Sequence, residues 1–211
     1  MRLASVNAPE RDECYAEPGV DHLIATLKGE TVSLEVIGED QFGRLLAHVF
    51  AGDRHVNLEL VEQGLALAST PEDGDVHGSA ILDAEDDAYA NGTGLWSKTA
   101  CGAEQIPEVV FEPGVSVTDP AGPDDQDIEA EAIAIRNMSN EVVDLAGWIL
   151  RDESSRHRLV FGDIQVGGGE TILVSSADDG WDPGDSPVWN NGGDMALLQL
   201  PDGTVVARWR Y

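Results

Sequence analysis

The chain has 211 residues, enough for one large domain or two of ordinary size, and its 42% hydrophobic content can supply a core to each. No run approaches the roughly 18 apolar residues of a membrane span, and no basic segment followed by an apolar one marks an export signal, so we expect a globular protein without a membrane span. Asp and Glu number 40 against 12 Lys and Arg, a net charge of −28, which excludes binding of polyanions through a broad basic surface.

The acidity is spread along the chain, because residues 1–104 hold 20 acids and 6 bases and residues 105–211 hold the same numbers. Carboxylates retain water, and their mutual repulsion is screened in molar salt, so the composition favours a halophilic archaeal source over an ordinary acidic mesophile. At about 1 M salt the Debye length is about 3 Å. A phosphate would then be held by short contacts from arginine, which supplies ten of the twelve bases.

Strand patterns come first in the N-terminal half. Residues 1–10, MRLASVNAPE, open with an apolar run that predicts a buried strand. Residues 29–37 and 43–50 are rich in β-branched and apolar side chains, and a short polar turn separates them. These two runs predict a hairpin.

Helical patterns follow the hairpin. Apolar residues recur at helical spacing through residues 56–68, and Asn57 is a candidate cap for the start of that helix. A second helical pattern stops near Asn91 and Gly92, where a left-handed cap forms easily. The N-terminal half is therefore predicted to mix α and β structure.

Beyond Cys101 the helical periods end. Residues 102–127 are rich in proline and acids and predict a linker that merges into a strand around residues 115–118. From residue 128 onward, short apolar runs alternate with turn signals every eight to twelve residues, which predicts a β-sandwich. We place the domain boundary near residue 105, which gives domains 1–104 and 105–211.

The two cysteines, Cys14 and Cys101, allow two interpretations. If they pair, they close a long loop that chain-entropy estimates value at about 4 to 5 kcal/mol, and they indicate an oxidising compartment. If they stay reduced, they are two buried thiols.

Four segments in order, RLASVNAPE, EDQFGRLLAHVF, VNLELVEQGLA and a helix ending in GLW, resemble the staphylococcal-nuclease-like (thermonuclease) family over residues 2 to about 100. The resemblance implies an OB-fold barrel packed with helices. It also implies hydrolysis of phosphodiester bonds in DNA and RNA with Ca²⁺ as cofactor. By this resemblance, Arg2 and Arg44 bind the phosphate and Glu10 acts on the attacking water.

These roles also agree with elementary chemistry. Two guanidinium groups can stabilise the charge that a phosphoryl transition state gathers on its oxygens, and a carboxylate can orient or deprotonate water. The alternative is that Arg2 and Arg44 pair with local carboxylates for structure alone.

The chain departs from the family pattern at two places. Asn7 stands where the family motif has a calcium-binding aspartate, so Asn7 and Glu10 would form a weak, incomplete calcium site. The two strands that precede this motif in the family, and their aspartate-bearing turn, have no counterpart before Met1. Either the gene start was set too late, or the barrel is reduced and leaves strand edges unpaired.

The second half resembles the lamin-tail domain, an immunoglobulin-like sandwich, through IAIRNMSNEVVDLAGWILRD and VWNNGGDMALLQLPDGTVV. Trp148 is predicted to fill its core, and residues 190–193 are predicted to form a glycine-dependent turn. The five histidines have no ligand spacing, so we expect no zinc site; they are His22, His48, His55, His77 and His157.

Together these features predict an α+β domain, a partial OB-fold barrel with helices, followed by an all-β immunoglobulin-like sandwich. The predicted function is that of a Ca²⁺-dependent endonuclease on DNA or RNA, with activity reduced by the missing aspartates and with a lamin-tail domain for anchoring to a surface or protein partner. The alternative is a non-catalytic interaction module derived from a nuclease. We expect an extracellular or cell-surface location if an upstream signal exists, and otherwise a cytoplasmic location at high salt.

Overall fold

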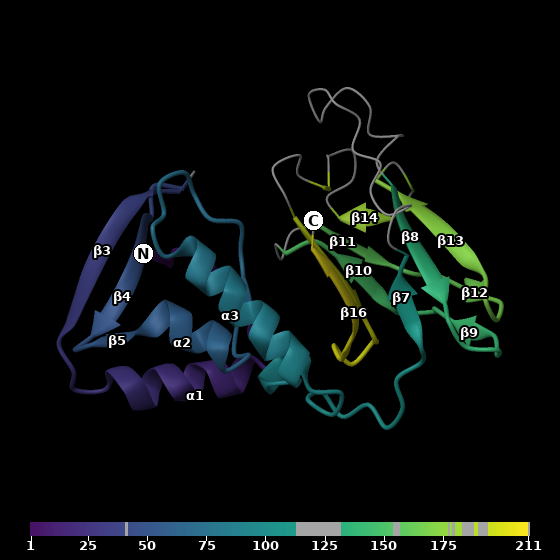
Figure 1. Ribbon diagram of the computed structural model, residues 1–211, viewed down its shortest axis with the longest axis horizontal. Coiled ribbons are helices and arrows are strands. Elements are labelled where there is room, and N and C mark those ends of the chain that lie inside the picture. The colour runs from purple at the N-terminus through teal and green to yellow at the C-terminus, as the bar shows by residue number, and fades with distance from the viewer. Residues whose placement is uncertain are drawn as a thin grey trace. The chain divides into compact units, whose positions relative to one another are not determined.

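The computed structural model describes residues 1–40, 42–112, 132–153, 157–176, 178, 180–182, 188–189 and 194–210. The chain divides into two compact units, Met1–Cys101 and Gly102–Tyr211 (Figure 1). Within the described ranges, no helix is both long and apolar enough to cross a membrane. The strand predicted around residues 115–118 and the turn predicted at residues 190–193 lie outside the described residues.

The first unit contains three α-helices among short and long strands. In chain order its elements are β1 (Arg2–Leu3), β2 (Val6–Asn7), α1 (Ala16–Leu27), β3 (Val32–Glu39), β4 (Leu45–Ala51), β5 (Arg54–His55), α2 (Val56–Glu62), β6 (Leu67–Ala68), α3 (Gly78–Asn91) and the 3-10 helix η1 (Gly94–Trp96). This α+β content agrees with the prediction. The single strand expected over residues 1–10 is instead two short strands, because the backbone turns at Ser5, where φ is +54°.

The main sheet of the first unit has the order β1-β4-β3, with β5 paired to β4. The β3–β4 pair is antiparallel, which confirms the predicted hairpin, and β1 runs parallel to β4. A separate pair joins β2 to β6. The described strands close no barrel, and β3 and β1 form the two sides of an open sheet.

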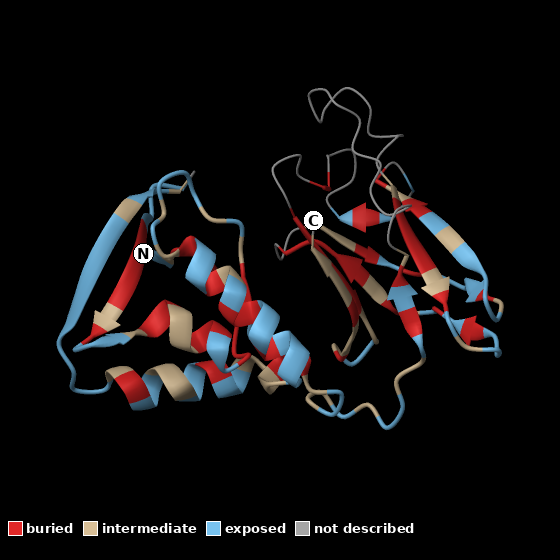
Figure 2. Ribbon diagram, in the orientation of Figure 1, coloured by how far each residue is buried: buried red, intermediate tan, exposed pale blue. Residues whose placement is uncertain are grey.

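The core of the first unit lies between one face of β4 and the helices. Figure 2 shows β4 buried along most of its length and β3 exposed along most of its length. Val49 and Ala51 of β4 pack in the same cluster as Val56 and Leu60 of α2. The sheet is therefore covered on this face where β4 runs, whereas β3 extends beyond the cover.

Asn57 does not cap α2 as predicted. It lies inside the helix, fully buried, and its Oδ1 accepts the N–H of Val49 at 2.9 Å. Its Nδ2 donates to the carbonyl oxygens of Ala4 at 2.9 Å and Ala47 at 3.2 Å. A buried amide needs such partners, and here they tie the helix to β4 and to the residue that follows β1.

The helix predicted over residues 56–68 is shorter, because α2 ends at Glu62 and the chain enters β6. The break comes at Gly64, where φ is +60° and an added Cβ would lie 2.2 Å from the carbonyl oxygen of Thr93. Only glycine tolerates both conditions. The second helical prediction is confirmed, since α3 ends at Asn91 and Gly92 adopts the left-handed conformation.

The second unit is all β over the residues described. Its strands are β7 (Val109–Phe111), β8 (Ala132–Asn137), β9 (Val143–Asp144), β10 (Ile149–Arg151), β11 (Arg158–Val160), β12 (Gln165–Val166), β13 (Thr171–Ser175), β14 (Trp181–Asp182), β15 (Met195–Gln199) and β16 (Val205–Arg210). They form antiparallel sheets of order β14-β11-β10-β15-β16, β13-β8-β7 and β12-β9. Trp148 is 4% exposed and belongs to the core of this unit, as predicted.

Cys14 and Cys101 form a disulfide with a Cα–Cα distance of 5.7 Å. The bond ties the segment before α1 to the last residue of the first unit. Of the two interpretations left open by the sequence, the structure therefore contains the paired one.

Candidate functional site

Arg2 and Arg44 lie at the same end of the parallel β1–β4 pair. Arg2 lies opposite Leu46, and Arg44 precedes Leu46 by two residues. Arg44 immediately precedes β4, so both arginines lie where the two parallel strands begin. Both are exposed.

Asp40 fixes the position of Arg44. The Nε of Arg44 donates to Oδ2 of Asp40 at 2.6 Å, and Oδ1 of Asp40 accepts the backbone N–H groups of Phe42 and Arg44 at 2.9 Å each. Partial desolvation opposes ionisation of Asp40, but the hydrogen bonds from Arg44 and Phe42 outweigh it and lower the pKa of the carboxyl group. The Nη groups of Arg44 make no hydrogen bond to a described residue, and the guanidinium carbon lies 5.4 Å from the centroid of the Phe42 ring.

Asn7 and Glu10 lie outside the β1–β4 pair in the hydrogen-bonding pattern. Asn7 belongs to β2, whose partner strand is β6. Glu10 opens a turn in which Glu13 donates its N–H to the Glu10 carbonyl oxygen at 2.8 Å. No hydrogen bond or ion pair among the described residues joins the exposed carboxylate of Glu10 to Arg2 or Arg44. Both arginines therefore lie at the β1–β4 pair, and the Glu10 carboxylate has no hydrogen bond or ion pair to a described residue.

The donor set near these residues is poor for calcium. Ca²⁺ takes six to eight oxygen ligands, several of them carboxylates, whereas Asn7 and Glu10 offer one amide and one carboxylate. Within the part of the chain that the structure describes, no group of three or more His, Cys, Asp or Glu side chains has the arrangement of a metal site. These two residues therefore do not fit a calcium ion by themselves.

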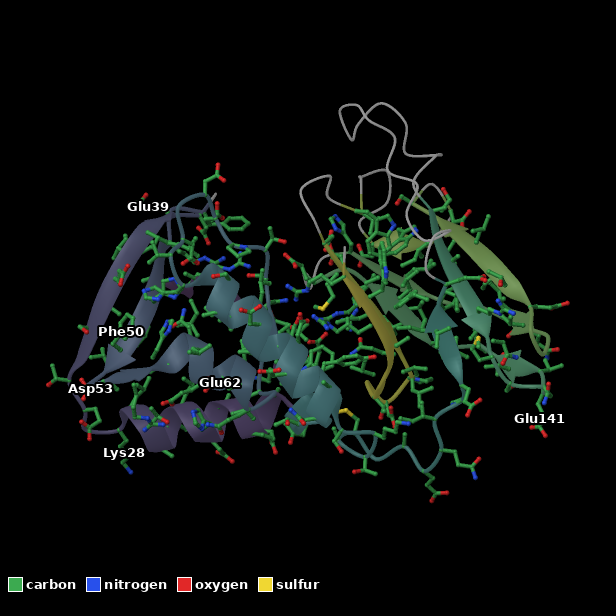
Figure 3. The ribbon with its side chains drawn as sticks, viewed as in Figure 1. Lys28, Glu39, Phe50, Asp53, Glu62 and Glu141 are labelled. Carbon is green, nitrogen blue, oxygen red and sulfur yellow. A yellow bond between two sulfur atoms is a disulfide. The ribbon has the colours of Figure 1, made fainter. Side chains whose placement is uncertain are left out.

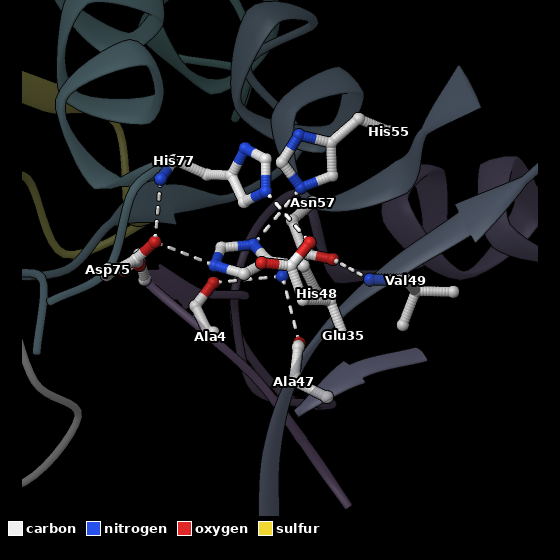
Figure 4. A network of polar contacts seen from close by, with 10 residues as sticks. Ala4, Glu35, Ala47, His48, Val49, His55, Asn57, Asp75 and His77 are labelled. Carbon is white, nitrogen blue, oxygen red and sulfur yellow. Dashed lines mark hydrogen bonds and ion pairs between the residues drawn. The ribbon is translucent and has the colours of Figure 1, made fainter. Parts of the chain in front are cut away.

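Three histidines, His48, His55 and His77, lie together near the start of α2, although the sequence indicated only scattered histidines (Figure 4). His48 of β4 is fully buried, and its Nδ1 is 3.1 Å from Nε2 of His55 at the end of β5. His77, which precedes α3, has its ring centroid 4.7 Å from that of His48 and 4.8 Å from that of His55. A tight β4–β5 turn brings residues 48 and 55 together, which is the signal that the sequence analysis missed.

Two carboxylates contact the histidine cluster, those of Asp75 and Glu35. Nε2 of His48 is 2.9 Å from Oδ1 of Asp75, which also accepts the backbone N–H of His77 at 2.8 Å. On the sheet side, Nε2 of His77 is 3.2 Å from Oε2 of Glu35. Burial alone would raise the pKa of Asp75, but hydrogen bonds from Ser5 and His77 and the nearby His48 lower it. The cluster therefore joins the entry of α3 to the β3–β4 hairpin.

His55 resists protonation. Desolvation, followed by repulsion from His48 and His77, lowers the pKa of His55 to about 4. When Nε2–H of His48 donates a hydrogen bond to the carboxylate of Asp75, Nδ1 of the neutral ring carries no hydrogen. Nδ1 can then accept the Nε2–H of His55. A second proton on the pair would break this arrangement.

We expect the first unit to lose stability as the pH falls from about 6.5 to about 4. The pKa of His55 is lower in the folded state, so its contribution is complete above its ordinary value of 6.5 and is lost as the unfolded chain takes up the proton first. For a half-buried ring the loss should be on the order of 1 to 3 kcal/mol. Denaturant titrations at several pH values would measure it.

A His55→Gln variant provides the comparison for this prediction. It should be less stable at pH 7 but show a flatter dependence between pH 6.5 and 5, the range above most carboxyl titrations. Equal slopes in wild type and His55→Gln would contradict the assignment.

Comparison with known proteins adds two family matches. Residues 1–98 match the family of staphylococcal nuclease homologues, and residues 105–211 match the lamin tail domain. An uncharacterized endonuclease of Haemophilus influenzae is 33% identical over 97 residues, which cover 46% of this chain and 53% of that protein. An uncharacterized endonuclease of Escherichia coli is 29% identical over 98 residues, covering 46% of this chain and 62% of that protein.

A plant protein is also similar, at lower identity. The staphylococcal-like nuclease CAN1 of Arabidopsis thaliana is 23% identical over 99 residues, covering 47% of this chain and 30% of that protein. The chain thus spans less than two thirds of the length of each relative. The similarity concerns a domain-sized part of these proteins.

Proposed function

The chain belongs to the lamin tail domain family through residues 105–211 and carries a staphylococcal-nuclease-like domain over residues 1–98, and from this combination we propose that it hydrolyses phosphodiester bonds in DNA or RNA. The observation that supports the proposal most directly is the pair of exposed arginines at the start of the parallel β1–β4 pair, Arg2 in β1 and Arg44 just before β4. In a chain of net charge −28, a cation without a carboxylate partner is unusual, and Arg2 has no ion pair among the described residues.

We assign the arginines to the phosphate. A guanidinium group presents planar donors that match two phosphate oxygens, and two of them can offset the charge that develops on these oxygens in the transition state. Asp40 holds Arg44 by Nε, so the Nη groups stay oriented for the substrate. This preorganised contact is short enough to act in molar salt.

We assign Glu10 to the attacking water. Its carboxylate would accept a proton as the water oxygen forms a bond to phosphorus and the phosphorus–oxygen bond to the leaving group breaks. The leaving oxygen takes up a proton from solvent. The exposure of Glu10 and its lack of a side-chain partner among the described residues agree with this role.

Turnover should be slower than the nuclease family implies. Relatives of this family typically use Ca²⁺, whereas Asn7 replaces one of the acidic ligands and no cluster of three acidic or histidine side chains forms a metal site in the described part of the chain. The same observation favours a second candidate function, a module that binds nucleic acid without cleaving it. In both cases the lamin tail domain would anchor the protein to a surface or protein partner, and the disulfide favours an extracellular location.

Cleavage of single-stranded DNA in molar KCl, with and without Ca²⁺, tests the proposal. The wild-type chain should cleave, and Glu10→Gln should lower the rate by about 10²- to 10⁴-fold, the usual contribution of a general base. Glu17→Gln, an exposed acid in α1, is the matched control and should leave the rate unchanged.

Two results would overturn this assignment. Cleavage that proceeds at the wild-type rate in Glu10→Gln would remove Glu10 from the reaction. Binding of DNA by the wild-type chain without any cleavage would support the non-catalytic module instead.

A further inference from the structure

The chain turns sharply at Ser5, between the two short strands that carry the N-terminal part of the proposed site. Arg2 lies in β1 before this corner, whereas Asn7 lies in β2 after it and Glu10 follows β2. Ser5 has a φ of +54°, which residues other than glycine rarely adopt. Such a conformation persists only where the surroundings enforce it, and it is found most often at functional sites. The contacts that hold this corner are therefore candidates for a functional role.

Asp75 holds the corner from the loop between β6 and α3. Its Oδ2 accepts the hydroxyl hydrogen of Ser5 at 2.5 Å, and the side chain of Asp75 is fully buried. In the same loop, the N–H of Ser69 donates to the carbonyl oxygen of Ser5 at 3.1 Å. The corner is thus fixed through its side chain and its backbone by a segment that lies far away in the sequence.

Asp75 is itself held in place by the histidine cluster. Its Oδ1 lies 2.9 Å from Nε2 of His48 and accepts the backbone N–H of His77 at 2.8 Å (Figure 4). Both carboxylate oxygens therefore have partners, and a hydrogen bond to an ionised acceptor is stronger than one between neutral groups. Asp75 offers Ser5 a strong acceptor in a fixed position.

The strands on either side of the corner cannot fix the angle between them by themselves. β1 and β2 are two residues long each, and each pairs with a different strand, β1 with β4 and β2 with β6. Such short ladders provide few hydrogen bonds. The hydrogen bond from Ser5 to Asp75 acts where the two strands meet, so it sets the direction in which the chain continues toward Glu10.

We propose that Asp75, acting through Ser5, is a positioning residue for phosphodiester cleavage. The inference rests on the proposed function, because it concerns the residues assigned there to the phosphate and to the attacking water. Asp75 touches neither group of the substrate; it holds the corner that relates the strand of Arg2 to the segment of Glu10. A misplacement of about 1 Å caused far from the chemistry can lower a rate about 10²-fold.

A double-mutant cycle of Ser5→Ala with Glu10→Gln tests the proposal, using single-stranded DNA in molar KCl. Ser5→Ala should lower kcat by about 10- to 100-fold with little change in KM, because the phosphate still binds while the transition-state geometry is lost. In the Glu10→Gln background the same substitution should lower kcat by less than about threefold, because the group that it positions is absent. Ser33→Ala removes an exposed hydroxyl from β3 and should leave kcat unchanged in both backgrounds.

Ser5→Gly separates the hydroxyl from the stability of the corner. Glycine adopts a φ of +54° without strain, so this variant loses the hydrogen bond to Asp75 but no favourable backbone conformation. It should fold and should still lower kcat as Ser5→Ala does.

Asp75→Asn tests the other partner of the same hydrogen bond. An amide has one acceptor oxygen in place of two, so it cannot accept hydrogen bonds from Ser5 and His48 on opposite sides. Its kcat should fall as that of Ser5→Ala does. Glu62→Gln makes the same charge change at the exposed end of α2 (Figure 3) and should leave kcat unchanged.

Amide hydrogen exchange measures the anchoring without any reaction. Ser5→Ala should speed exchange of the Ser69 N–H, which donates to the Ser5 carbonyl oxygen, by about tenfold or more. The Val49 N–H, which donates to Asn57, lies outside the corner and should exchange at the wild-type rate.

The possible failures can be told apart. A wild-type chain that does not cleave DNA overturns the proposed function, and the inference falls with it. If the wild type cleaves, three results overturn the inference alone: additive effects in the double-mutant cycle, a wild-type kcat in Ser5→Gly, or unchanged exchange of the Ser69 N–H in Ser5→Ala.

Discussion

Replacing Arg44 by alanine is expected to lower the rate of phosphodiester cleavage by about 10²- to 10³-fold, the usual effect of removing one donor to a developing oxyanion. The reason is geometric, since Asp40 holds Nε at 2.6 Å and leaves the Nη groups to the phosphate. Arg44→Lys should not restore the rate, because an ammonium group cannot donate to Asp40 and the phosphate in the same fork. Initial rates on single-stranded DNA in molar KCl would measure both variants.

Arg54→Ala is the matched control. It removes the same charge from the same unit, but the Arg54 guanidinium is already paired with Glu59 at 2.8 and 2.6 Å. We expect its cleavage rate to stay close to that of the wild type. A loss as large as that of Arg44→Ala would mean that net charge, and not the position of Arg44, controls the reaction.

Removing the disulfide is expected to destabilise the first unit by about 2 to 5 kcal/mol. The bond joins residues that are 87 positions apart, so the unfolded state of the Cys14→Ser, Cys101→Ser double variant gains much conformational freedom. Guanidinium unfolding followed by circular dichroism would measure the change.

Reduction of the wild-type chain serves as the second arm of that experiment. A thiol reductant should shift the wild-type transition toward that of the double variant and should leave the double variant unaffected. Equal transition midpoints in the oxidised wild type and the double variant would show that the bond adds nothing to stability.

Features encoded by short sequence patterns could be predicted. The β3–β4 hairpin follows from two β-branched runs around a polar turn, and the end of α3 follows from Asn91 and Gly92. In these two cases the residues that decide the structure are neighbours in the chain. The burial of Trp148 was predicted from the resemblance of the second half to the lamin tail domain.

Features decided by contacts between distant parts of the chain could not be predicted from the sequence. Helical spacing continues to residue 68, but α2 stops at Glu62 because Gly64 packs against the backbone at Thr93. The histidine cluster depends on the fold of three separate segments, and only the pair His48 and His55 could have been inferred from the hairpin between them.

For the candidate site, too, some features could be predicted from the sequence and others could not. A family resemblance indicated Arg2 and Arg44, and both lie at the start of the parallel β1–β4 pair. The role of Asp40 required coordinates, because it depends on a turn in which one carboxylate binds two backbone N–H groups and a guanidinium. The position of Glu10 relative to the arginines stays a prediction.

Strand β1 is only two residues long, so few ladder hydrogen bonds hold it to β4. The side-chain amide of Asn57 donates a hydrogen bond to the carbonyl oxygen of Ala4, the residue that follows β1. In the proposed site, the backbone that carries Arg2 is thus held by a buried side chain that lies away from the surface. A substitution at Asn57 would loosen this backbone, and with it the proposed contact of Arg2 with the phosphate, while leaving every surface residue in place.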